Sequence, residues 1–510
     1  MMKNGASDRG GGSNPEKAHR MALSQSVEEN LAQIREKLGP SPDLIIRRFE
    51  LQAGRTKAAA VYMDGLTDKL MVNEFILHAL IAESGGEVEQ TASGKSLIDA
   101  VQANMLSIGG VEPVRDLDGA LLGLLSGDTV LLLEGYADAL GCSTQGGAVR
   151  SIEEPTSQIV IRGPKDGFNE SIGTNVSLVR RRIKSSNLWL EKMQVGTVTR
   201  TDVAMMYLKG VANEKIIKEV KKRINDIHFD SILESGYIEN FIQDQAMTPF
   251  PTLLNTERPD TVAANILEGR VAVFVDGTPF VLIAPTTFFM YFQAAEDYYQ
   301  RMDVATAIRL LRYFAFFISM FGPSIYIAAI TYHQELIPTQ LIISLAAQRE
   351  SVPFPALVEA LIMEVTFEIL REAGVRLPRA VGQAVSIVGA LVLGQAAVEA
   401  GIISSAMVIV VAITGISSFA SPAFNVALSV RLIRFAIMLC AALLGFYGIV
   451  LFSIWMVAHM CGLRSFGVSY MSPLTPLYTD DQKDTLVRAS FYNMASRPSF
   501  ARPRDDKRGG

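Results

Sequence analysis

Charge of either sign is scarce in the central part of the sequence. Positions 313–462 contain no aspartate and no lysine, and only 13 of these residues are charged. Over all 510 residues the charged fraction is 19%, and the formal net charge is −5. A negative net charge supplies no general attraction for phosphate, so we expect no nucleic-acid partner.

Cysteine and histidine are too few and too dispersed to form a site. Cys142, Cys440 and Cys461 lie far apart and predict neither a disulfide framework nor a CxxC metal pair. The five histidines show no HExxH or HxH spacing. The segment Glu89–Ser96 imitates a phosphate-binding loop, but glutamate stands where the pattern needs glycine. We therefore expect no catalytic residue, no cofactor and no metal site, and the protein is predicted not to be an enzyme.

The distribution of charge divides the chain into four parts. Residues 1–30 are polar, rich in glycine and serine, and without the apolar run of a secretory signal, so we expect a disordered arm. Residues 31–279 are predicted to form a cytoplasmic mixed α/β domain. Residues 280–463 are predicted to form an all-α membrane domain with four to five spanning helices, and 464–510 a polar C-terminal tail.

The predicted α/β domain alternates strands with helices. Short β-branched runs predict strands at Thr129–Glu134, Gln158–Arg162, Val203–Leu208 and Val271–Val275. Apolar residues at helical spacing predict a helix at Glu214–Ile227. The pattern indicates one large or two smaller subdomains, with a boundary near 153–157 or 196–201. The basic run 180–184 is interpreted as a solvated helix face, with contact to headgroups or a partner as the alternative.

Four uncharged stretches beyond position 279 are long enough to cross a bilayer, which takes about 20 apolar residues. They are Tyr313–Gln334, Ala380–Val398, Ala400–Val430 (with a turn near Pro422) and Phe435–Leu463. Pro279–Gln293 is shorter, and we expect it to pack against the protein or lie at the interface. Gly322 and Pro323 are the hinge candidates, because proline lacks the helical N–H and should kink the first stretch.

Arginines beside these stretches predict their orientation, because Lys and Arg concentrate in cytoplasmic loops. Arg309 and Arg312 precede the first stretch, and Arg431 and Arg434 precede the last, so these four are the topology anchors. Consistency requires Val352–Leu370 to cross as well, which gives five spans and an external C-terminus. The arginine-rich tail favours an internal C-terminus, in which case one apolar segment is re-entrant.

The segment 355–374 (PALVEALIMEVTFEILREAG) carries carboxylates at membrane depth. On a helix, Glu364, Glu368 and Glu372 fall within an arc of about 80°, with Leu357 and Leu361 on the same side and Glu359 nearly opposite. Bare carboxylates must face a partner or a water-filled cavity. For Glu368 and Glu372, pairing with Arg371, Arg376 or Arg379 is one interpretation. For Glu364, an aqueous lining and a buried pair both stay open. Leu357, Leu361, Glu364 and Glu368 are therefore the pore-lining candidates.

Long runs of this sequence resemble the A subunits of GerA-type spore germinant receptors, from about Pro40 to Pro498. The runs that carry the resemblance are RGPKDGFNESIGTNVSLVRRRI (162–183), HFDSILESGYIENFI (228–242), TERPDTVAANILEGRVAVFVDGTPFVLI (256–283), AAEDYYQR (294–301), RLLRYFAFFIS (309–319), VPFPALVEALIMEVTFEILREAGVRLP (352–378) and GQAVSIVGALVLGQAAVEAGI (382–402). Related family members act as accessory germination proteins outside a receptor.

The resemblance implies a location, partners and a function. Such A subunits lie in the spore inner membrane, with a permease-like B subunit that is taken to bind the nutrient and a lipoprotein C subunit. They are thought to form an oligomer that conducts ions when the germinant binds. The leading hypothesis is therefore an ion-conducting receptor subunit that contacts membrane lipid. A non-conducting scaffold that relays the signal is the main alternative, and a secondary transporter has less support, because matching broken helices are not found in two halves.

Overall fold

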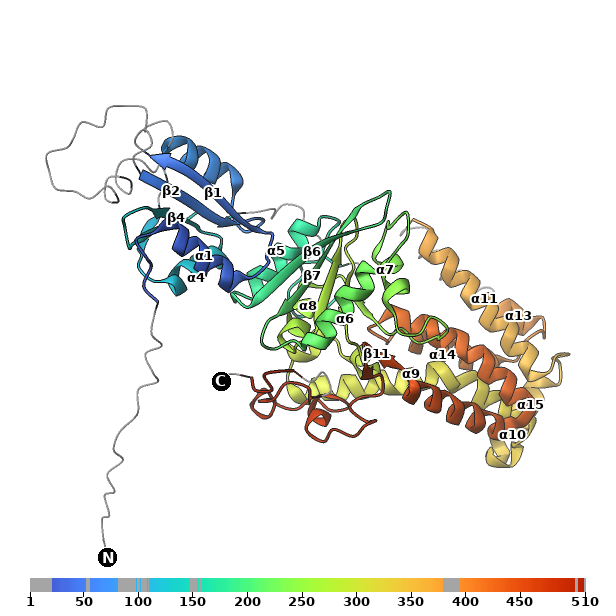
Figure 1. The fold of residues 1–510 in the computed structure, drawn as a ribbon. Coiled ribbons are helices and arrows are strands. Elements are labelled where there is room, and N and C mark those ends of the chain that lie inside the picture. The colour runs from blue at the N-terminus through green and yellow to red at the C-terminus, as the bar shows by residue number, and fades with distance from the viewer. Residues whose placement is uncertain are drawn as a thin grey trace, which may run out of the picture. The chain divides into compact units, whose positions relative to one another are not determined.

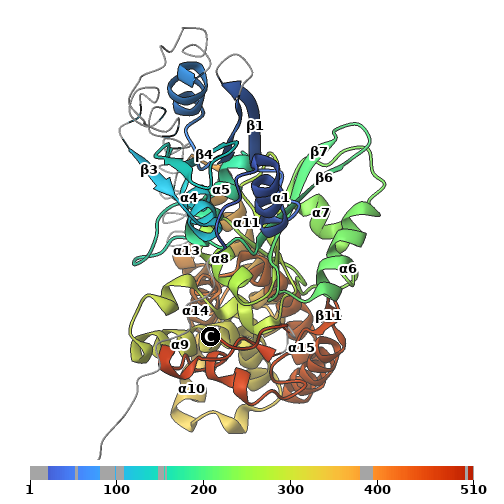
Figure 2. The ribbon, with the colours of Figure 1, turned by 60° about the vertical axis from the view of Figure 1, so that its left-hand side comes forward.

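The computed structural model describes residues 21–51, 56–80, 98, 101, 108, 110–146, 154–155, 158–378, 394–499 and 503–508. The chain divides into two compact units (Figures 1 and 2). The first unit comprises Met1–Ile152 and Gly173–Lys192, and the second comprises Glu153–Ile172 and Met193–Gly510. The second unit thus joins an α/β part to the whole helical region. The predicted phosphate-loop imitation at 89–96 lies outside the described residues.

The first unit is built on an antiparallel sheet of five strands in the order β1-β2-β4-β5-β3. The alternating side chains of β2 supply two cores: Ala59 and Val61 pack with one set of apolar residues, and Ala58 and Ala60 with another. The elements of this unit are α1 (Val27–Leu38), β1 (Leu44–Leu51), β2 (Thr56–Met63), η1 (Met71–His78), β3 (Val111–Val114), α4 (Leu117–Ser126), β4 (Thr129–Leu133), β5 (Ala139–Cys142) and α5 (Ile172–Arg182).

Two expectations about this unit are wrong in part. The arm predicted for residues 1–30 is wrong from Leu23 on, because Leu23 is buried in the core and α1 begins at the buried Val27. Residues 1–20 lie outside the described residues. The basic run was expected on a solvated helix face, yet Arg180 has no exposed surface. Its guanidinium pairs with both carboxylate oxygens of Asp43 and donates to the carbonyl of Leu188 at 3.1 Å. A carboxylate 137 positions away in sequence cannot be found from local pattern.

The α/β part of the second unit contains a second five-stranded sheet, in the order β6-β7-β9-β10-β8. The strands predicted at 129–134, 203–208 and 271–275 and the helix predicted at 214–227 are confirmed. The elements of this part are β6 (Leu188–Val195), β7 (Thr201–Leu208), α6 (Glu214–Asn225), α7 (Ser235–Ile242), β8 (Leu254–Thr256), α8 (Pro259–Leu267), β9 (Val271–Val275) and β10 (Val281–Ala284).

The strand predicted at Gln158–Arg162 is wrong, since these residues form no strand. Side-chain contacts hold the segment instead: Thr256 donates to the Gln158 side chain at 2.6 Å, and Arg258 donates to the Gln158 carbonyl at 3.3 Å. Ile159 and Ile161 are 78% and 92% exposed. A run of β-branched residues indicates only that the side chains suit a sheet surface. Whether a strand forms also depends on a neighbouring strand to which its backbone can hydrogen-bond.

The helical region follows two short turns of 3₁₀ helix, η3 (Phe288–Phe292) and η4 (Ala295–Tyr298). All five residues of η3 are buried, so the predicted packing segment does pack. The later elements are α9 (Met302–Thr331), η5 (Gln334–Leu336), α10 (Thr339–Arg349), α11 (Ala356–Arg376), α13 (Gly394–Glu399), α14 (Ser405–Ser418), α15 (Phe424–Gly462), β11 (Arg464–Ser465), β12 (Val468–Ser469), η7 (Asp480–Asp484) and η8 (Phe491–Asn493). Among the described helices, α9 and α15 are long and apolar enough to cross a membrane. Most of the stretch predicted at 380–398 lies outside the described residues.

The long segment α15 is two helical legs rather than one. Gly445 interrupts it with φ 62° and ψ −144°, a conformation that only glycine adopts readily. We call residues 424–444 the first leg and 446–462 the second leg. A Cβ added to Gly448 would collide with the carbonyl oxygen of Cys440, which shows how sharply the second leg turns back on the first.

Both ends of α15 lie near residues 252–256, which comprise β8 and the residues just before it, in agreement with the reversal. Residues 419–423, just before the first leg, line a cavity of about 270 Å³ together with Leu254 and Thr256 of β8. Just after the second leg, the Ser465 hydroxyl donates to the Thr252 carbonyl at 2.8 Å. A straight helix of 39 residues would be about 58 Å long and would separate these ends.

Contacts from the end of α9 stabilise the turn. The Tyr332 hydroxyl donates to the carbonyls of Ala442 and Leu443 at 2.9 and 3.1 Å, so it satisfies acceptors next to the break. His333 packs against Phe446 with ring centroids 5.0 Å apart. A Cβ on Gly445 would lie 2.7 Å from the His333 ring.

We expect Gly445→Ala to destabilise the protein, because it combines a strained backbone, costing about 1–3 kcal/mol, with a collision against His333. Gly462→Ala is the matched control, because a Cβ there meets nothing within 4 Å and alanine favours a helix. Thermal unfolding of the detergent-solubilised full chain measures both. Equal stability of the two variants would contradict a sharp turn at Gly445.

Candidate functional site

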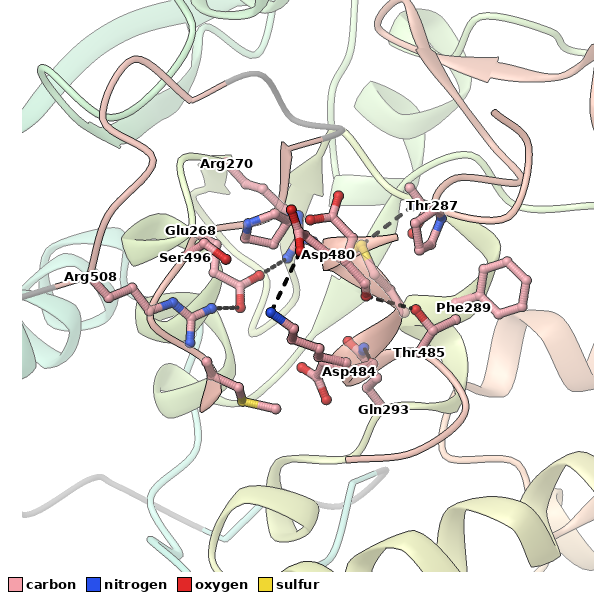
Figure 3. A pocket seen from close by; sticks show the side chains of 16 residues that line it. Glu268, Arg270, Thr287, Phe289, Gln293, Asp480, Asp484, Thr485, Ser496 and Arg508 are labelled. Carbon is pink, nitrogen blue, oxygen red and sulfur yellow. Dashed lines mark hydrogen bonds and ion pairs between the residues drawn. The ribbon is translucent and has the colours of Figure 1, made fainter. Parts of the chain in front are cut away.

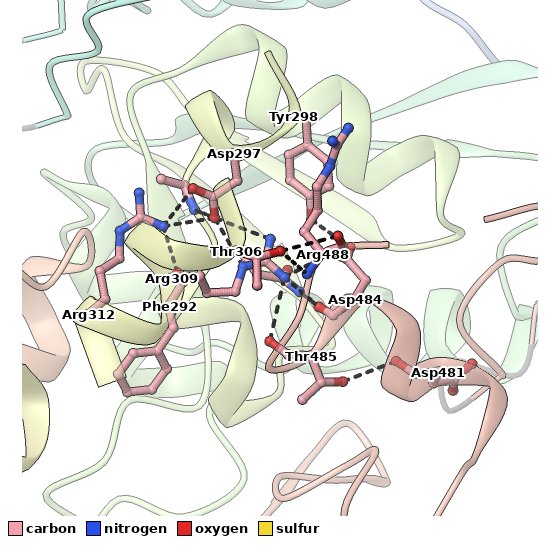
Figure 4. A network of polar contacts seen from close by, with 12 residues as sticks. Phe292, Asp297, Tyr298, Thr306, Arg309, Arg312, Asp481, Asp484, Thr485 and Arg488 are labelled. Carbon is pink, nitrogen blue, oxygen red and sulfur yellow. Dashed lines mark hydrogen bonds and ion pairs between the residues drawn. The ribbon is translucent and has the colours of Figure 1, made fainter. Parts of the chain in front are cut away.

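A buried ion-pair network lies where α9 begins (Figure 4). Asp297 of η4 is 2% exposed and accepts from two arginines of α9. Its oxygens lie 2.7 Å from Nη1 of Arg312 and 3.2 Å from Nη2 of Arg309. Glu296 accepts from Arg312 at 3.2 Å. The predicted anchors Arg309 and Arg312 are thus buried and paired, a role that the sequence did not indicate.

Asp484 of the C-terminal tail belongs to the same ion-pair network. Its carboxylate accepts from Nη1 of Arg309 at 2.8 Å and from the Tyr298 hydroxyl at 2.7 Å. Its carbonyl accepts from the Gln293 side chain at 2.7 Å. The tail therefore binds the first turns of α9 by charge as well as by shape. Nearly 190 positions separate Asp484 from Tyr298, so local pattern gives no signal for the pair.

A small polar cavity adjoins this network (Figure 3). Its volume is about 60 Å³, and Gln293 and Asp484 are among the residues that line it. At its edge, Glu268 accepts from Arg270 at 2.8 Å and from Arg508 at 3.0 Å. That volume holds only about two water molecules. Within the described part of the chain, no group of three or more His, Cys, Asp or Glu could hold a metal ion.

The deepest carboxylate of α11, Glu364, is fully buried and paired with Arg434 of the first leg. The two side chains are 0% and 1% exposed. Of the two possibilities left open for Glu364, the single chain adopts the buried pair. Leu357 and Leu361, on the same face of α11, are half-buried. Whether this face lines a pore in an assembly stays a prediction.

The remaining carboxylates of α11 are also paired. Glu368 accepts from Arg371 at 3.1 Å and lies 3.5 Å from Arg431, and Glu372 pairs with Arg376 on the exposed surface. Pairing was one of the two interpretations for these residues, and it is confirmed for the partners Arg371 and Arg376. The partner predicted at 379 lies outside the described residues.

Glu359, on the opposite face of α11, holds two helices together. Its Oε2 accepts from the backbone N–H and the hydroxyl of Ser404, the N-cap of α14, at 3.0 and 2.8 Å. Its other oxygen accepts from Arg349 at the end of α10. A carboxylate at a helix N-terminus is favoured by the unpaired N–H groups there. Sequence analysis placed Glu359 on the opposite face but missed this role.

The two hinge candidates lie inside α9, which stays helical past Pro323. Proline cannot donate to the carbonyl of Ser319, so one backbone hydrogen bond is missing. A Cβ on Gly322 would lie 2.7 Å from Oγ1 of Thr414, so glycine allows α14 to approach closely. Hinge motion at this position stays a prediction. The break that the structure does contain, at Gly445, was missed, although a glycine within a long apolar run was a possible signal.

Outside the helical region, the carboxyl of Glu239 has a strongly raised pKa. Burial of Glu239, on α7, raises its pKa to about 7, and the nearby charge of Glu234 adds to the effect. Glu234 itself is held as the N-cap of α7, where its carboxylate accepts from the Gly236 N–H and, at 2.9 Å, from the Thr278 hydroxyl. The protonation state of Glu239 therefore changes near neutral pH.

Known proteins are similar to this chain over most of its length. Residues 32–500 match the family described as "Bacillus/Clostridium GerA spore germination protein". "Spore germination protein KA" of Bacillus subtilis is 51% identical over 97% of this chain and 90% of that protein. "Uncharacterized membrane protein YfkQ" of the same organism is 45% identical over 93% and 91%. The crystal structure of the N-terminal domain of the A subunit of the Bacillus megaterium germinant receptor GerK3 matches 53% of this chain and 98% of its own, at 41% identity and a TM-score of 0.43.

We expect Glu239 to make the free energy of unfolding depend on pH. Its folded pKa of about 7 exceeds the ordinary glutamate pKa of 4.5, so the stabilisation is full below pH 4.5 and is lost as the pH rises through 7. Glu239→Gln should remove roughly 1–3 kcal/mol of this dependence and be the more stable protein at pH 8. Thermal unfolding between pH 5 and 8 measures it, with the exposed Glu170→Gln as control. Parallel curves for wild type and Glu239→Gln would rule out a buried titrating carboxyl.

Proposed function

Because the chain belongs to the GerA spore germination protein family, we propose that it is the A subunit of a germinant receptor in the spore inner membrane. The match of residues 32–500, nearly the whole chain, is the observation that carries the proposal. In this role it works with a permease-like B subunit and a lipoprotein C subunit. It takes part in germination triggered by a nutrient.

We infer a membrane topology in which both termini are cytoplasmic. The reversal at Gly445 supports it, because the first leg leaves the α/β part and the second leg returns to it. All four predicted anchors then lie on the same side, in agreement with the bias of Lys and Arg. The arginine-rich tail lies on that side too. The conflict between five spans and an internal tail disappears, because the last apolar stretch crosses twice.

The order of the other helices agrees with this topology. Glu359 contacts Ser404 at the start of α14, and Arg371 donates to Ser418 at its end at 3.0 Å, so α11 and α14 run parallel. Both then lead towards the α/β part. With the crossing that the sequence predicts at 380–398, a stretch mostly outside the described residues, the crossings by α9, α11, α14 and the two legs give an even number.

Cysteine labelling tests the topology. In a background with Cys142, Cys440 and Cys461 replaced by alanine, single cysteines are placed at three exposed sites, Val198, Leu336 and Tyr492. We expect a membrane-impermeant maleimide to label Leu336→Cys in intact cells. Val198→Cys and Tyr492→Cys should react only after lysis. Different accessibility at 198 and 492 would overturn the even number of crossings.

For the activity itself, we propose that several copies assemble and conduct ions, with α11 facing the pore. Leu357 and Leu361 are half-buried in the single chain, so this face is open to contact with another copy or with water. Glu364 is neutralised by Arg434 in the single chain, so it attracts cations only if assembly separates the pair. A non-conducting scaffold or an accessory germination protein is the alternative. The tail contacts of Asp484 favour a relay from the α/β part to α9 in either case.

The role of Glu364 needs a variant that keeps the fold. Glu364→Gln alone leaves Arg434 buried without a charge partner, so we expect a loss of roughly 3–5 kcal/mol and low abundance. Glu364→Leu with Arg434→Met replaces the pair by apolar groups and should restore abundance. If Glu364 lines the pore, cation flux in liposomes falls in this double variant, whereas Leu361→Ser leaks ions.

The matched control is Glu372→Leu with Arg376→Met, which removes an exposed pair on the same helix. We expect the control to conduct as wild type does. Normal cation flux in the abundant Glu364 double variant would exclude Glu364 from the pore. No flux from wild type or Leu361→Ser would favour the scaffold.

A further inference from the structure

Five charged residues form a cluster between α11 and the first leg, and their charges do not balance. The cluster consists of Glu364, Glu368, Arg371, Arg431 and Arg434, so three positive charges face two negative ones. The side chains of Arg371, Arg431 and Arg434 are only 8%, 15% and 1% exposed. A buried charge without a partner is strongly unfavourable. The arrangement is therefore short of one anion.

The pairing within the cluster identifies where the anion is missing. Glu364 forms an ion pair with Arg434. Glu368 forms ion pairs with both Arg371, at 3.1 Å, and Arg431, at 3.5 Å. Arg431 thus has the longest ion pair of the cluster. Among the described residues, Nε of Arg371 and Arg431 and Nε and Nη2 of Arg434 have no hydrogen-bond acceptor. Glu364 Oε1, beside Arg434, also has no hydrogen-bond partner, so an acceptor is missing chiefly for the Nε atoms of Arg371 and Arg431.

The rest of the helical region does not supply the missing charge. Glu359 accepts from Arg349 and Ser404, Glu372 pairs with Arg376, and Glu399 accepts from Gln395. Glu335, after α9, and Glu350, after α10, are exposed. The residues between 378 and 394, which the structure does not describe, contain no aspartate and no glutamate in the sequence. The anion must therefore come from outside this helical region.

The position of the cluster points to the headgroup layer of a membrane. Arg431 lies two turns after Phe424, at the end of the first leg near the α/β part. The rings of Phe419 and Phe424 beside it are 66% and 59% exposed. Arg371 stacks on the Phe419 ring at 4.9 Å, and Arg431 lies 6.0 Å from the Phe424 ring. Exposed Phe side chains suit contact with lipid tails, and arginine beside them suits the adjacent headgroup layer.

We propose that Arg431 and Arg371 bind the phosphate of an anionic phospholipid headgroup from the inner leaflet. The guanidinium fork matches phosphate oxygens, and the free Nε atoms supply the donors. A phosphodiester would neutralise the extra positive charge, and its acyl chains would lie along the exposed Phe424. Basic pockets between helices on the cytoplasmic side bind lipid headgroups in the same way. This inference rests on the proposed membrane insertion.

The test compares two variants with the same change of charge. The full chain is reconstituted into vesicles of phosphatidylcholine with one part in ten phosphatidylglycerol, extracted in mild detergent, and the retained lipid is quantified by mass spectrometry. Arg431→Gln removes the residue with the weakest pairing. Arg376→Gln is the matched control, because Arg376 is on α11, outside the cluster and 78% exposed.

We expect the lipid retained by wild type and by Arg376→Gln to contain a higher fraction of phosphatidylglycerol than the vesicles do. For Arg431→Gln, we expect this enrichment to be about fivefold smaller. Equal loss in both variants, or no enrichment in wild type, would overturn the proposal. So would displacement of the lipid by millimolar inorganic phosphate, which would indicate a site for a soluble anion. A smaller oligomer for Arg431→Gln without a change in retained lipid would indicate a carboxylate of a partner protein instead.

Failure of the underlying topology gives a different result. If the chain does not insert, wild type and both variants all fail to associate with the vesicles. This result is seen before any retained lipid is quantified. Retention in the vesicles without enrichment of phosphatidylglycerol contradicts the lipid site alone.

Discussion

Both ends of a 39-residue apolar segment lie near residues 252–256 of the α/β part, and this constraint organises the second unit. A continuous helix cannot satisfy it, so the chain reverses at Gly445, where φ is positive and Tyr332 satisfies the carbonyls of the turn. The reversal brings the polar tail back to the start of α9. Asp484 can then reach Arg309, and the tail becomes part of the junction between the α/β part and the helices.

Arginine placement in the helical region follows a second physical rule. A guanidinium in a medium of low dielectric constant needs a carboxylate nearby, because only the attraction to an opposite charge offsets the free-energy cost of its desolvation. Arg309, Arg312 and Arg434 each have one within ion-pair distance, and each carboxylate belongs to a different element from its arginine. The arginines predicted as topology anchors thus join elements of the helical region. Arg431 departs from this rule most clearly, since its shared carboxylate lies 3.5 Å away.

Local pattern was sufficient where the structure depends on neighbours in sequence. The β-branched runs at 129–133 and 271–275 are strands, the run at 214–225 is an amphipathic helix, and the α11 carboxylates Glu368 and Glu372 pair with arginines three or four positions away. Local pattern gave wrong predictions where the interacting residue or strand is remote in the sequence. Gln158–Arg162 has the composition of a strand without a strand to pair with, and Arg180 has the setting of a surface residue but reaches Asp43.

The sequence by itself determined the division into an α/β part and an apolar helical part, because composition and periodicity depend only on the order of residues. It also determined the family, through long matching runs, and the positions of the charged residues. Only the tertiary structure decided which charges meet and in which direction the last segment runs. Ion pairs such as Glu364 with Arg434 form between helices 70 positions apart. A reversal at one glycine changes the direction in which all later residues run. Neither the ion pairs nor the reversal leave a periodic signal in the sequence.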